Sequence, residues 1–245
     1  MTQLYAIYSL NSKNFEHMIQ NKEVYDLQLK KIETACSNGI KWFQFRFKFL
    51  SADASRPLIH PPLLRFILEI IEICQKWRIQ FILNDHLLWM ESLLGYSWDL
   101  QPGLHLGQGD SQLLEARQQL GQRIIIGITC HNSLDLSQIA LKNGASYTAF
   151  GRFYTSSTKP NAEKAEIATL LEARDYHDSL ALTNPIAVIG GITPSNVEPL
   201  AKAGADLIAA SGAIWGAYLD TPPSVERRCH SFQKVLAQSD ELTHA

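Results

Sequence analysis

Residues 42–49 read Trp42-Phe43-Gln44-Phe45-Arg46-Phe47-Lys48-Phe49, an unbroken alternation of aromatic and polar side chains. Side chains alternate faces along a β-strand, so the phenylalanines share one face and an amide and two cations share the other. In a β/α barrel the aromatic face would meet the surrounding helices. The pattern then points Gln44, Arg46 and Lys48 into the barrel or toward its mouth, where an anion or a carboxylate has to offset their charge. An ordinary half-exposed strand is the alternative.

Short apolar runs recur along the whole chain, with amphipathic stretches between them. Eight runs predict strands over Leu4–Leu10, Trp42–Phe49, Gln80–Asp85, Gly103–Leu106, Ile124–Thr129, Tyr147–Arg152, Ile186–Gly191 and Leu207–Ser211. The stretches between them predict helices over Tyr25–Ser37, Leu63–Lys76, Ser111–Leu120, Leu134–Asn143, Ala162–Tyr176 and Ser195–Ala203. Gly144 and Gly204 stand where glycines end helices, and Thr193-Pro194 is typical of a helix start.

Eight strands that alternate with helices are the pattern of a (β/α)8 barrel. We therefore expect an α/β protein with one TIM-barrel domain over residues 1–245. Its core would span about residues 4–218, and a C-terminal helix would span about residues 224–238. A doubly wound sheet with fewer strands is the competing architecture.

The net charge, the cysteines and the length of the apolar runs limit which kinds of ligand and partner we expect. A net charge of −2 gives no basic field for nucleic acid, so we expect phosphorylated small molecules as ligands and no nucleic acid. The four cysteines form no CxxC pair, which favours reduced thiols in a cytoplasmic protein. No apolar run approaches the roughly 18 residues of a membrane span, so no membrane contact is expected. The sequence leaves open whether the chain forms a homo-oligomer.

Two aspartates follow consecutive predicted strands. Asp85 ends the third strand, and Asp110 comes shortly after the fourth. Carboxyl ends of barrel strands meet at one mouth, and neighbouring carboxylates there repel each other unless a cation lies between them. Oxygen ligands suit Mg2+, so a magnesium site is the first hypothesis. Each aspartate also precedes a predicted helix, so capping of that helix is the alternative.

The exits of the last three strands carry groups suited to phosphate. Gly190 and Gly191 follow the seventh strand, and Ser211 and Gly212 follow the eighth, where barrels of this class bind phosphate on backbone N–H groups. The sixth exit offers hydroxyl groups and a lysine, at Ser156, Ser157, Thr158 and Lys159. An ordinary polar loop and a tight turn are the alternatives for these segments.

Three further features are ambiguous from the sequence alone. The loop Leu50–Pro62 is long for a connection at this face and reads equally well as a lid or as a surface insertion. His105 lies within a strand, and His131 follows the fifth strand. Neither histidine has a positioned nucleophile beside it, and Cys130 points to the face opposite His131.

In their order and spacing, these segments resemble the thiamine-phosphate synthase / TenI superfamily of (β/α)8 barrels, from the first strand to Ile214. The stretches that carry the resemblance are QFRFK at Gln44–Lys48, ILND at Ile82–Asp85, GLHLGQGD at Gly103–Asp110, GITCHN at Gly127–Asn132, STK at Ser157–Lys159, and IGGIT followed by SGAI. The sixth exit is locally similar to the synthase-like domain fused to Nudix hydrolases.

The resemblance implies a transferase that joins an aminopyrimidine diphosphate to a thiazole phosphate, giving thiamine phosphate and pyrophosphate with Mg2+. It implies that Asp85 and Asp110 bind the metal, and that Arg46, Lys48 and Lys159 stabilise the leaving group. The pyrimidine diphosphate would contact Gln44, Arg46, Lys48, Asn84, Thr129 and Lys159. The thiazole phosphate would contact Ser156, Ser157, Thr158, Gly190, Gly191, Ser211 and Gly212.

The chain departs from the family pattern at several positions. Phe47 replaces an acidic residue, Thr129 replaces a serine, Arg152 replaces a proline, Ser156 replaces a threonine and Gly212 replaces a serine. Two other functions therefore compete with the synthase: a TenI-type thiazole tautomerase and a non-catalytic barrel that binds a thiazole phosphate. The tautomerase would not need Arg46, Lys48 and both aspartates together. A phosphate-binding isomerase is disfavoured because no strand-end acid/base pair stands out.

Overall fold

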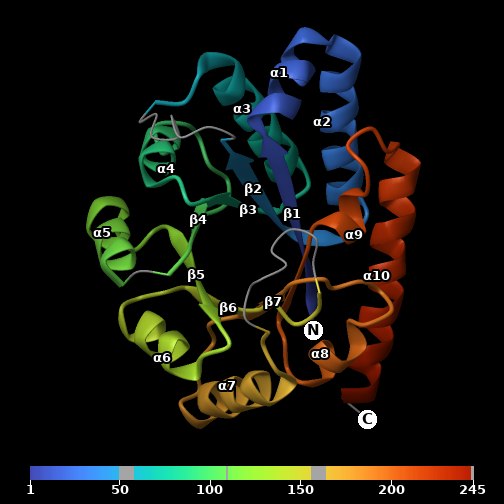
Figure 1. The fold of residues 1–245 in the computed structure, drawn as a ribbon. Coiled ribbons are helices and arrows are strands. Elements are labelled where there is room, and N and C mark those ends of the chain that lie inside the picture. The colour runs from blue at the N-terminus through green and yellow to red at the C-terminus, as the bar shows by residue number, and fades with distance from the viewer. Residues whose placement is uncertain (50–57, 109, 156–163, 244–245) are drawn as a thin grey trace.

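The strands form a closed parallel barrel in chain order in the computed structural model, which describes residues 1–49, 58–108, 110–155 and 164–243 (Figure 1). Helices surround the barrel between successive strands. The predicted TIM barrel is confirmed, and the doubly wound alternative is wrong. The strands are β1 (Gln3–Asn11), β2 (Ile40–Lys48), β3 (Gln80–Asn84), β4 (Gly103–Leu106), β5 (Ile125–His131), β6 (Tyr147–Phe150), β7 (Ile186–Ile189) and β8 (Leu207–Ala210).

Every predicted helix overlaps an observed one, but three short helices were missed: α1 (Ser12–Gln20), α4 (Leu87–Leu93) and α9 (Gly212–Trp215). The helices α4 and α9, with 7 and 4 residues, carry too few residues for a period of 3.6 to be recognised, whereas α1 has 9 residues, as many as the predicted α6. A cap was the available signal for α1, because the Asn11 side chain accepts a hydrogen bond from the backbone N–H of Asn14. The other helices are α2 (Lys22–Ser37), α3 (Pro61–Lys76), α5 (Asp110–Leu120), α6 (Leu134–Lys142), α7 (Ile167–Ser179), α8 (Glu198–Lys202) and α10 (Pro222–Thr243).

The helix α8 begins later than its sequence predicts. Asn196 accepts a hydrogen bond from the Thr193 N–H and donates one to the Gly191 carbonyl, which holds residues 191–196 in a turn. The predicted helix start at Thr193-Pro194 is therefore wrong. The helix-ending glycines are confirmed, because Gly144 and Gly204 follow α6 and α8 with φ values of 89° and 91°.

The alternation in β2 has the predicted consequence. Phe43, Phe45 and Phe47 are buried in the layer between the barrel and its helices, with Phe66 of α3 against Phe45. Gln44 lies on the opposite face, inside the barrel, where it is 3% exposed. The barrel interior has its own apolar cluster, which consists of Tyr5, Ile7, Ile82, Tyr147, Ala149, Ala187, Leu207 and Ala209.

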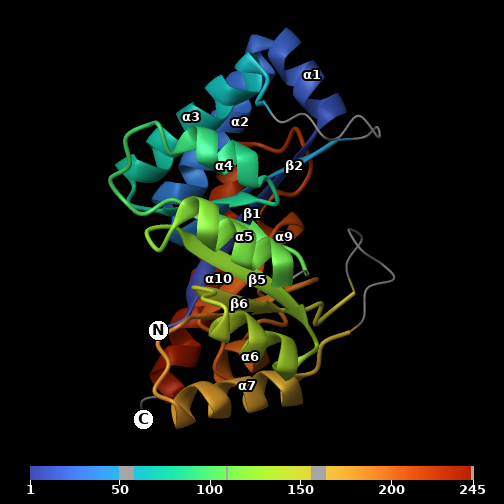
Figure 2. The same cartoon turned by 90° about the vertical axis from the view of Figure 1, so that its left-hand side faces the viewer.

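Contacts between distant parts of the chain close the barrel. The strand β1 pairs with β8, and the indole N–H of Trp215 donates a hydrogen bond to the carbonyl of Ile7 at 2.8 Å. The ammonium group of Lys31 on α2 is buried and donates to the carbonyls of Ala217 and Tyr218. The side view shows the carboxyl ends of β2 and β5 on one side of the molecule, with both chain termini on the other (Figure 2).

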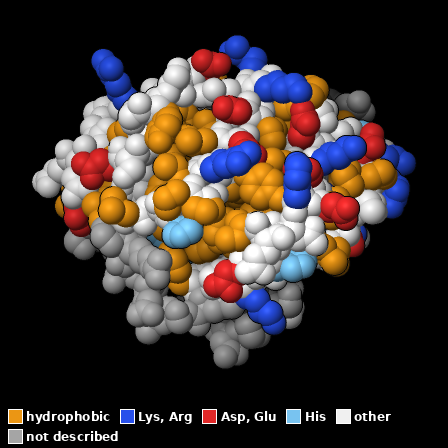
Figure 3. Space-filling model, turned by 90° about the horizontal axis from the view of Figure 1, so that it is seen from above, with side chains coloured by type: hydrophobic (Ala, Val, Ile, Leu, Met, Phe, Trp, Pro, Cys, Tyr) orange, Lys and Arg blue, Asp and Glu red, His pale blue; other side chains and the backbone are white. Residues whose placement is uncertain are grey.

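The outer surface over α1, α2 and α3 is mixed in character. Lysine, arginine, aspartate and glutamate side chains are interspersed there, and hydrophobic side chains are exposed between them (Figure 3). Among the described residues, no helix combines the length and the apolar character that a bilayer crossing requires.

Candidate active site

A continuous chain of hydrogen bonds crosses the barrel interior beneath its mouth. The Gln44 amide Nε2 donates to the hydroxyl of Tyr5 at 2.8 Å, and the Tyr5 and Tyr147 hydroxyls lie 2.8 Å apart. The Tyr147 hydroxyl is 2.9 Å from Nδ1 of His105. The other imidazole nitrogen, Nε2 of His105, is 3.0 Å from the hydroxyl of Thr129. Five strands therefore contribute to one polar chain, which we call the barrel relay: Gln44, Tyr5, Tyr147, His105 and Thr129.

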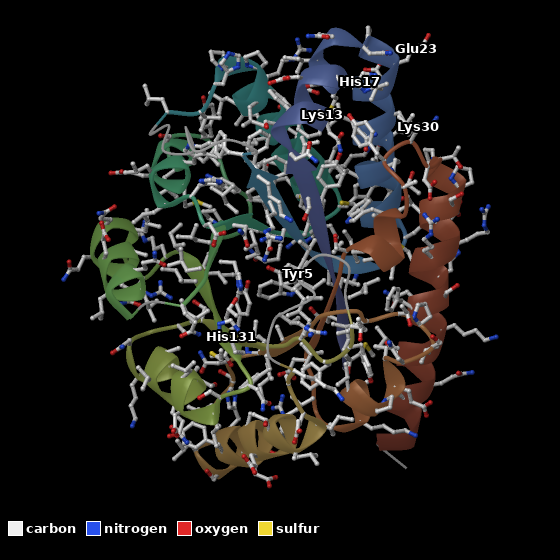
Figure 4. All side chains as sticks on the ribbon, in the orientation of Figure 1. Tyr5, Lys13, His17, Glu23, Lys30 and His131 are labelled. Atoms are coloured by element: carbon white, nitrogen blue, oxygen red, sulfur yellow. The ribbon has the colours of Figure 1, made fainter. Side chains whose placement is uncertain are left out.

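The two tyrosines of the barrel relay are its most buried members, with exposed fractions of 1% for Tyr5 and 0% for Tyr147. Burial raises the pKa of both hydroxyls above the ordinary tyrosine value, although the Gln44 amide opposes the shift in each. Both hydroxyls are therefore protonated at neutral pH and can donate. Tyr5 lies near the centre of the ring of strands (Figure 4).

The predicted cations occupy the carboxyl-terminal half of β2. Arg46 pairs in register with Ser9 of β1, and Lys48 pairs with Asn11, so both lie nearer the mouth than Gln44. Both residues are half-buried. No hydrogen bond or ion pair joins the Arg46 guanidinium to another residue of the described ranges. Arg46 is thus available to an anionic ligand at this face.

Asp85 follows β3 with an exposed carboxylate. Its Oδ2 accepts a hydrogen bond from the buried Asn84 amide at 2.5 Å, and its backbone N–H donates to the carbonyl of His105. The helix α4 begins at Leu87 after His86, which makes no side-chain cap, so capping by Asp85 is not observed. The carboxylate is oriented by its neighbour and free to meet a cation.

Several predicted ligands lie outside what the structure describes. Asp110 is the first residue of α5, but its side chain is not among the described parts of the chain. The same holds for Ser156, Ser157, Thr158 and Lys159, and for residues 50–57 of the long loop. Their roles stay predictions.

Gly190 and Gly191 allow two strand exits to pack closely. Both have positive φ, of 104° and 61°, and a Cβ built on Gly190 would overlap Arg152. A Cβ on Gly191 would overlap the backbone of Tyr154 and Thr155, and the Tyr154 N–H donates to the Gly190 carbonyl. The segment that approaches these glycines closely is the chain's own β6 exit. On the side where a Cβ would lie, the space is therefore filled by protein, as the tight-turn alternative expects.

Gly212 is different, because a Cβ built there meets no heavy atom within 4 Å. It opens α9 directly after Ser211, whose carbonyl accepts from the N–H groups of Ile214 and Trp215. The first N–H groups of a helix have no partner within the helix. A side chain would fit at Gly212 without displacing any described neighbour.

Cys130 and His131 lie at an irregularity of β5, where the pairing with β6 shifts register between Thr129 and His131. Cys130 is buried in the outer core, where burial raises the pKa of its thiol to about 12. His131 is the last residue of β5, at the carboxyl end of the strand, and has a φ of 50°. A thiol with such a pKa is not a nucleophile at neutral pH.

The sequence reasoning missed two members of the barrel relay, Tyr5 and Tyr147, and one neighbour, Gln108, and it left the role of His105 ambiguous. Tyr5, His105 and Tyr147 carry the middle of the relay, and the Gln108 amide donates to the backbone carbonyl of Thr129. The alternation along β1 and β6 places both tyrosines on inward faces, and this signal was present in the sequence.

The closed (β/α)8 barrel carries two cations, a carboxylate and an amide toward the carboxyl ends of β2 and β3, the face where enzymes of this fold place their sites. The chain belongs to the thiamine monophosphate synthase family, whose model matches residues 17–214.

Named relatives and a solved structure agree with this family. A thiamine-phosphate synthase of Marinobacter nauticus is 39% identical over 217 residues, which are 89% of this chain and 87% of that protein. A thiamine-phosphate synthase of Saccharophagus degradans is 38% identical over 185 residues, 76% of each chain. The structure of a Pyrococcus furiosus thiamine phosphate pyrophosphorylase superposes with a TM-score of 0.69 at 19% identity, covering 97% of this chain and 96% of that one. At this identity the superposition supports the fold alone.

Proposed function

We propose that this chain is a Mg2+-dependent transferase that joins an aminopyrimidine diphosphate to a thiazole phosphate, releasing pyrophosphate and forming thiamine phosphate. The observation that carries the proposal is the group at the mouth of β2 and β3, where Gln44, Arg46 and Lys48 share one face and Asp85 follows the next strand. A tautomerase has no use for a site that neutralises a leaving diphosphate.

The chemistry requires a carbon–oxygen bond to the diphosphate to break and a carbon–nitrogen bond to the thiazole to form. The pyrimidine ring stabilises the carbocation left at its methylene carbon, and negative charge accumulates on the departing pyrophosphate. Arg46 and Lys48 would stabilise that charge, joined by Lys159. The thiazole nitrogen would then attack the carbocation, so positioning of the two substrates supplies much of the remaining catalysis.

The donor set at β3 suits Mg2+. Magnesium is commonly held by one or two carboxylates together with substrate phosphates and waters, so Asp85 with Asp110 would be sufficient. The Asn84 amide that holds Oδ2 of Asp85 leaves Oδ1 for a cation. Bound magnesium would neutralise charge on the diphosphate.

The thiazole phosphate would bind at the exits of β6 to β8. We assign its phosphate to backbone N–H groups near Gly191, Ser211 and Gly212, supported by the open face of Gly212. Ser156, Ser157 and Thr158 would contact the rest of this substrate, and Asn84 and Thr129 would contact the pyrimidine. We further propose that residues 1–245 form one domain and that the protein is cytoplasmic, in keeping with four buried free cysteines.

The direct test is incubation of the purified chain with both substrates, with and without Mg2+, following thiamine phosphate and pyrophosphate. We expect equimolar products only when both substrates and the metal are present. Absence of both products, with retained binding of the thiazole phosphate, would identify the non-catalytic barrel. Isomerisation of a thiazole phosphate without pyrophosphate release would identify the tautomerase.

A further inference from the structure

The barrel relay has a direction, which follows from the orientation of the Gln44 amide, because each hydroxyl and the imidazole can donate or accept. The Gln44 Nε2 group only donates, so the Tyr5 oxygen accepts from it. The Tyr5 hydroxyl then has one remaining partner for its own hydrogen, the oxygen of Tyr147. The Tyr147 hydroxyl, in turn, donates to Nδ1 of His105.

The direction fixes the tautomer of His105. A neutral imidazole carries one proton, so an Nδ1 that accepts leaves the proton on Nε2. The Nε2–H group then donates to the hydroxyl oxygen of Thr129. The Thr129 hydroxyl hydrogen is consequently directed away from His105 and is available for another acceptor.

The two ends of the relay therefore differ in hydrogen-bond character. At one end, Gln44 turns its NH2 group to Tyr5, which leaves Oε1 as an acceptor. At the other end, Thr129 offers a donor. An aminopyrimidine carries an amine donor next to ring-nitrogen acceptors, so an acceptor and a donor on neighbouring walls complement it.

We propose that Tyr5 and Tyr147 are positioning residues, which lock the orientation of the Gln44 amide and the Thr129 hydroxyl so that the site recognises an aminopyrimidine. The geometry supplies the reason for two buried tyrosine hydroxyls beside the apolar residues of the barrel interior, where leucine or phenylalanine would fill the same space. The identity of the ligand rests on the proposed function, whereas the direction of the relay does not.

The chain contains a matched control for tyrosine-to-phenylalanine changes. Tyr8 lies on β1 like Tyr5, is 4% exposed, and donates its hydroxyl to the Gln28 side chain at 3.0 Å. It faces the helix layer and lies outside the barrel relay. Tyr8→Phe therefore removes a buried, hydrogen-bonded hydroxyl from the same strand without touching the relay.

The first experiment reads the tautomer of His105 by 15N NMR of the free protein at about pH 8, above the ordinary pKa of histidine. We expect the Nε2–H form in the wild type and in Tyr8→Phe, and a mixture of both tautomers in Tyr147→Phe, where Nδ1 loses its donor. A wild-type His105 that carries its proton on Nδ1 would reverse the relay and overturn the proposal.

The second experiment separates the two substrates. We expect Tyr5→Phe and Tyr147→Phe to raise KM for the aminopyrimidine diphosphate about tenfold, while their KM for the thiazole phosphate changes less than about twofold. In Tyr8→Phe, KM for each substrate should change less than about twofold. With an analogue that lacks the amine, the difference between wild type and Tyr5→Phe should shrink. Equal effects on both substrates, or none on either, would reduce the tyrosines to structural residues. If the tautomer result holds and no pyrophosphate forms, the proposed function fails while the relay stands.

Discussion

Gly127 of β5 lies directly against the ring of Tyr147, its partner in register on β6. A Cβ built on Gly127 would overlap the ring itself, so the missing side chain at one position makes room for the hydroxyl at the other. The barrel relay thus depends on Gly127, which is not a member of the relay and contributes only the space for the Tyr147 ring.

Gly127→Ala should therefore displace the Tyr147 ring. We expect the free energy of unfolding to fall by about 1–3 kcal/mol, the usual cost of overpacking a core, together with tautomer mixing at His105. Urea denaturation and 15N NMR measure the two effects. Gly95→Ala is the control, because its added Cβ would meet only the Ser92 carbonyl oxygen, at 3.6 Å. A Gly127→Ala protein as stable as wild type would contradict the packing argument.

Arg46→Gln should lower kcat/KM for the condensation by about 100-fold or more, because a charge that stabilises the leaving group is lost. Lys41→Gln changes an exposed cation at the other end of the same strand and should leave kcat/KM unchanged. Steady-state kinetics with the aminopyrimidine diphosphate as the varied substrate distinguish them. If both variants lost kcat/KM to a similar extent, the effect would come from the net charge of the protein and not from a contact between Arg46 and the substrate.

Asp85→Asn should abolish Mg2+-dependent turnover and leave the fold intact. Asp85 has a φ of 65°, a conformation that asparagine tolerates and alanine disfavours by roughly 1 kcal/mol. We therefore expect Asp85→Ala to be the less stable variant in urea, although both lose the metal response. Asp99→Asn, at an exposed loop position, should keep the wild-type Mg2+ titration curve. An unaltered curve for Asp85→Asn would remove this residue from the metal site.

His177 should make the protein less stable in mild acid. It is 0% exposed, and neither ring nitrogen has a hydrogen-bond partner within the described ranges. Burial, aided by the charge of Arg174, lowers its pKa in the folded state. Below the ordinary histidine pKa of about 6.5, the unfolded chain gains a proton here that the folded protein does not. The free energy of unfolding should thus decrease as pH falls from about 6.5 toward the lowered pKa.

The test compares urea unfolding at several pH values for wild type and His177→Leu. The leucine variant should show a shallower loss of stability across this range. His230→Gln, which removes an exposed histidine from α10, should follow the wild-type curve. An identical slope in wild type and His177→Leu would show that other groups control the acid sensitivity.

The barrel could be predicted from the sequence because the pattern that indicates each strand involves only residues close together in the chain. Strand alternation depends on neighbours two residues apart, and this spacing alone separated Phe43 and Phe45 from Gln44 and Arg46. The helices α4 and α9, with 7 and 4 residues, lack enough turns to show a period. The late start of α8 depends on the Asn196 side chain, whose two hydrogen bonds no propensity scale reports.

The barrel relay could not be predicted in the same way. The hydroxyls of Tyr5 and Tyr147 are 142 positions apart in the chain, and their contact depends on strand order, register and the space at Gly127 together. Arg46 and Asp85 could be proposed from the sequence because their charges stand at predicted strand ends. A buried tyrosine, in contrast, is ordinary in a core until its hydroxyl partner is known.

The closure of the barrel between its first and last strands bears on the order in which the protein can mature on the ribosome. Gln3 to Ala6 pair with residues 207–210, and Lys31 needs the carbonyls of Ala217 and Tyr218. The amino-terminal segment therefore emerges about 200 residues before its partners exist, and such distant contacts form slowly. During synthesis the edge of β1 and the ammonium group of Lys31 stay exposed, which makes this interval the one in which chaperones would matter most.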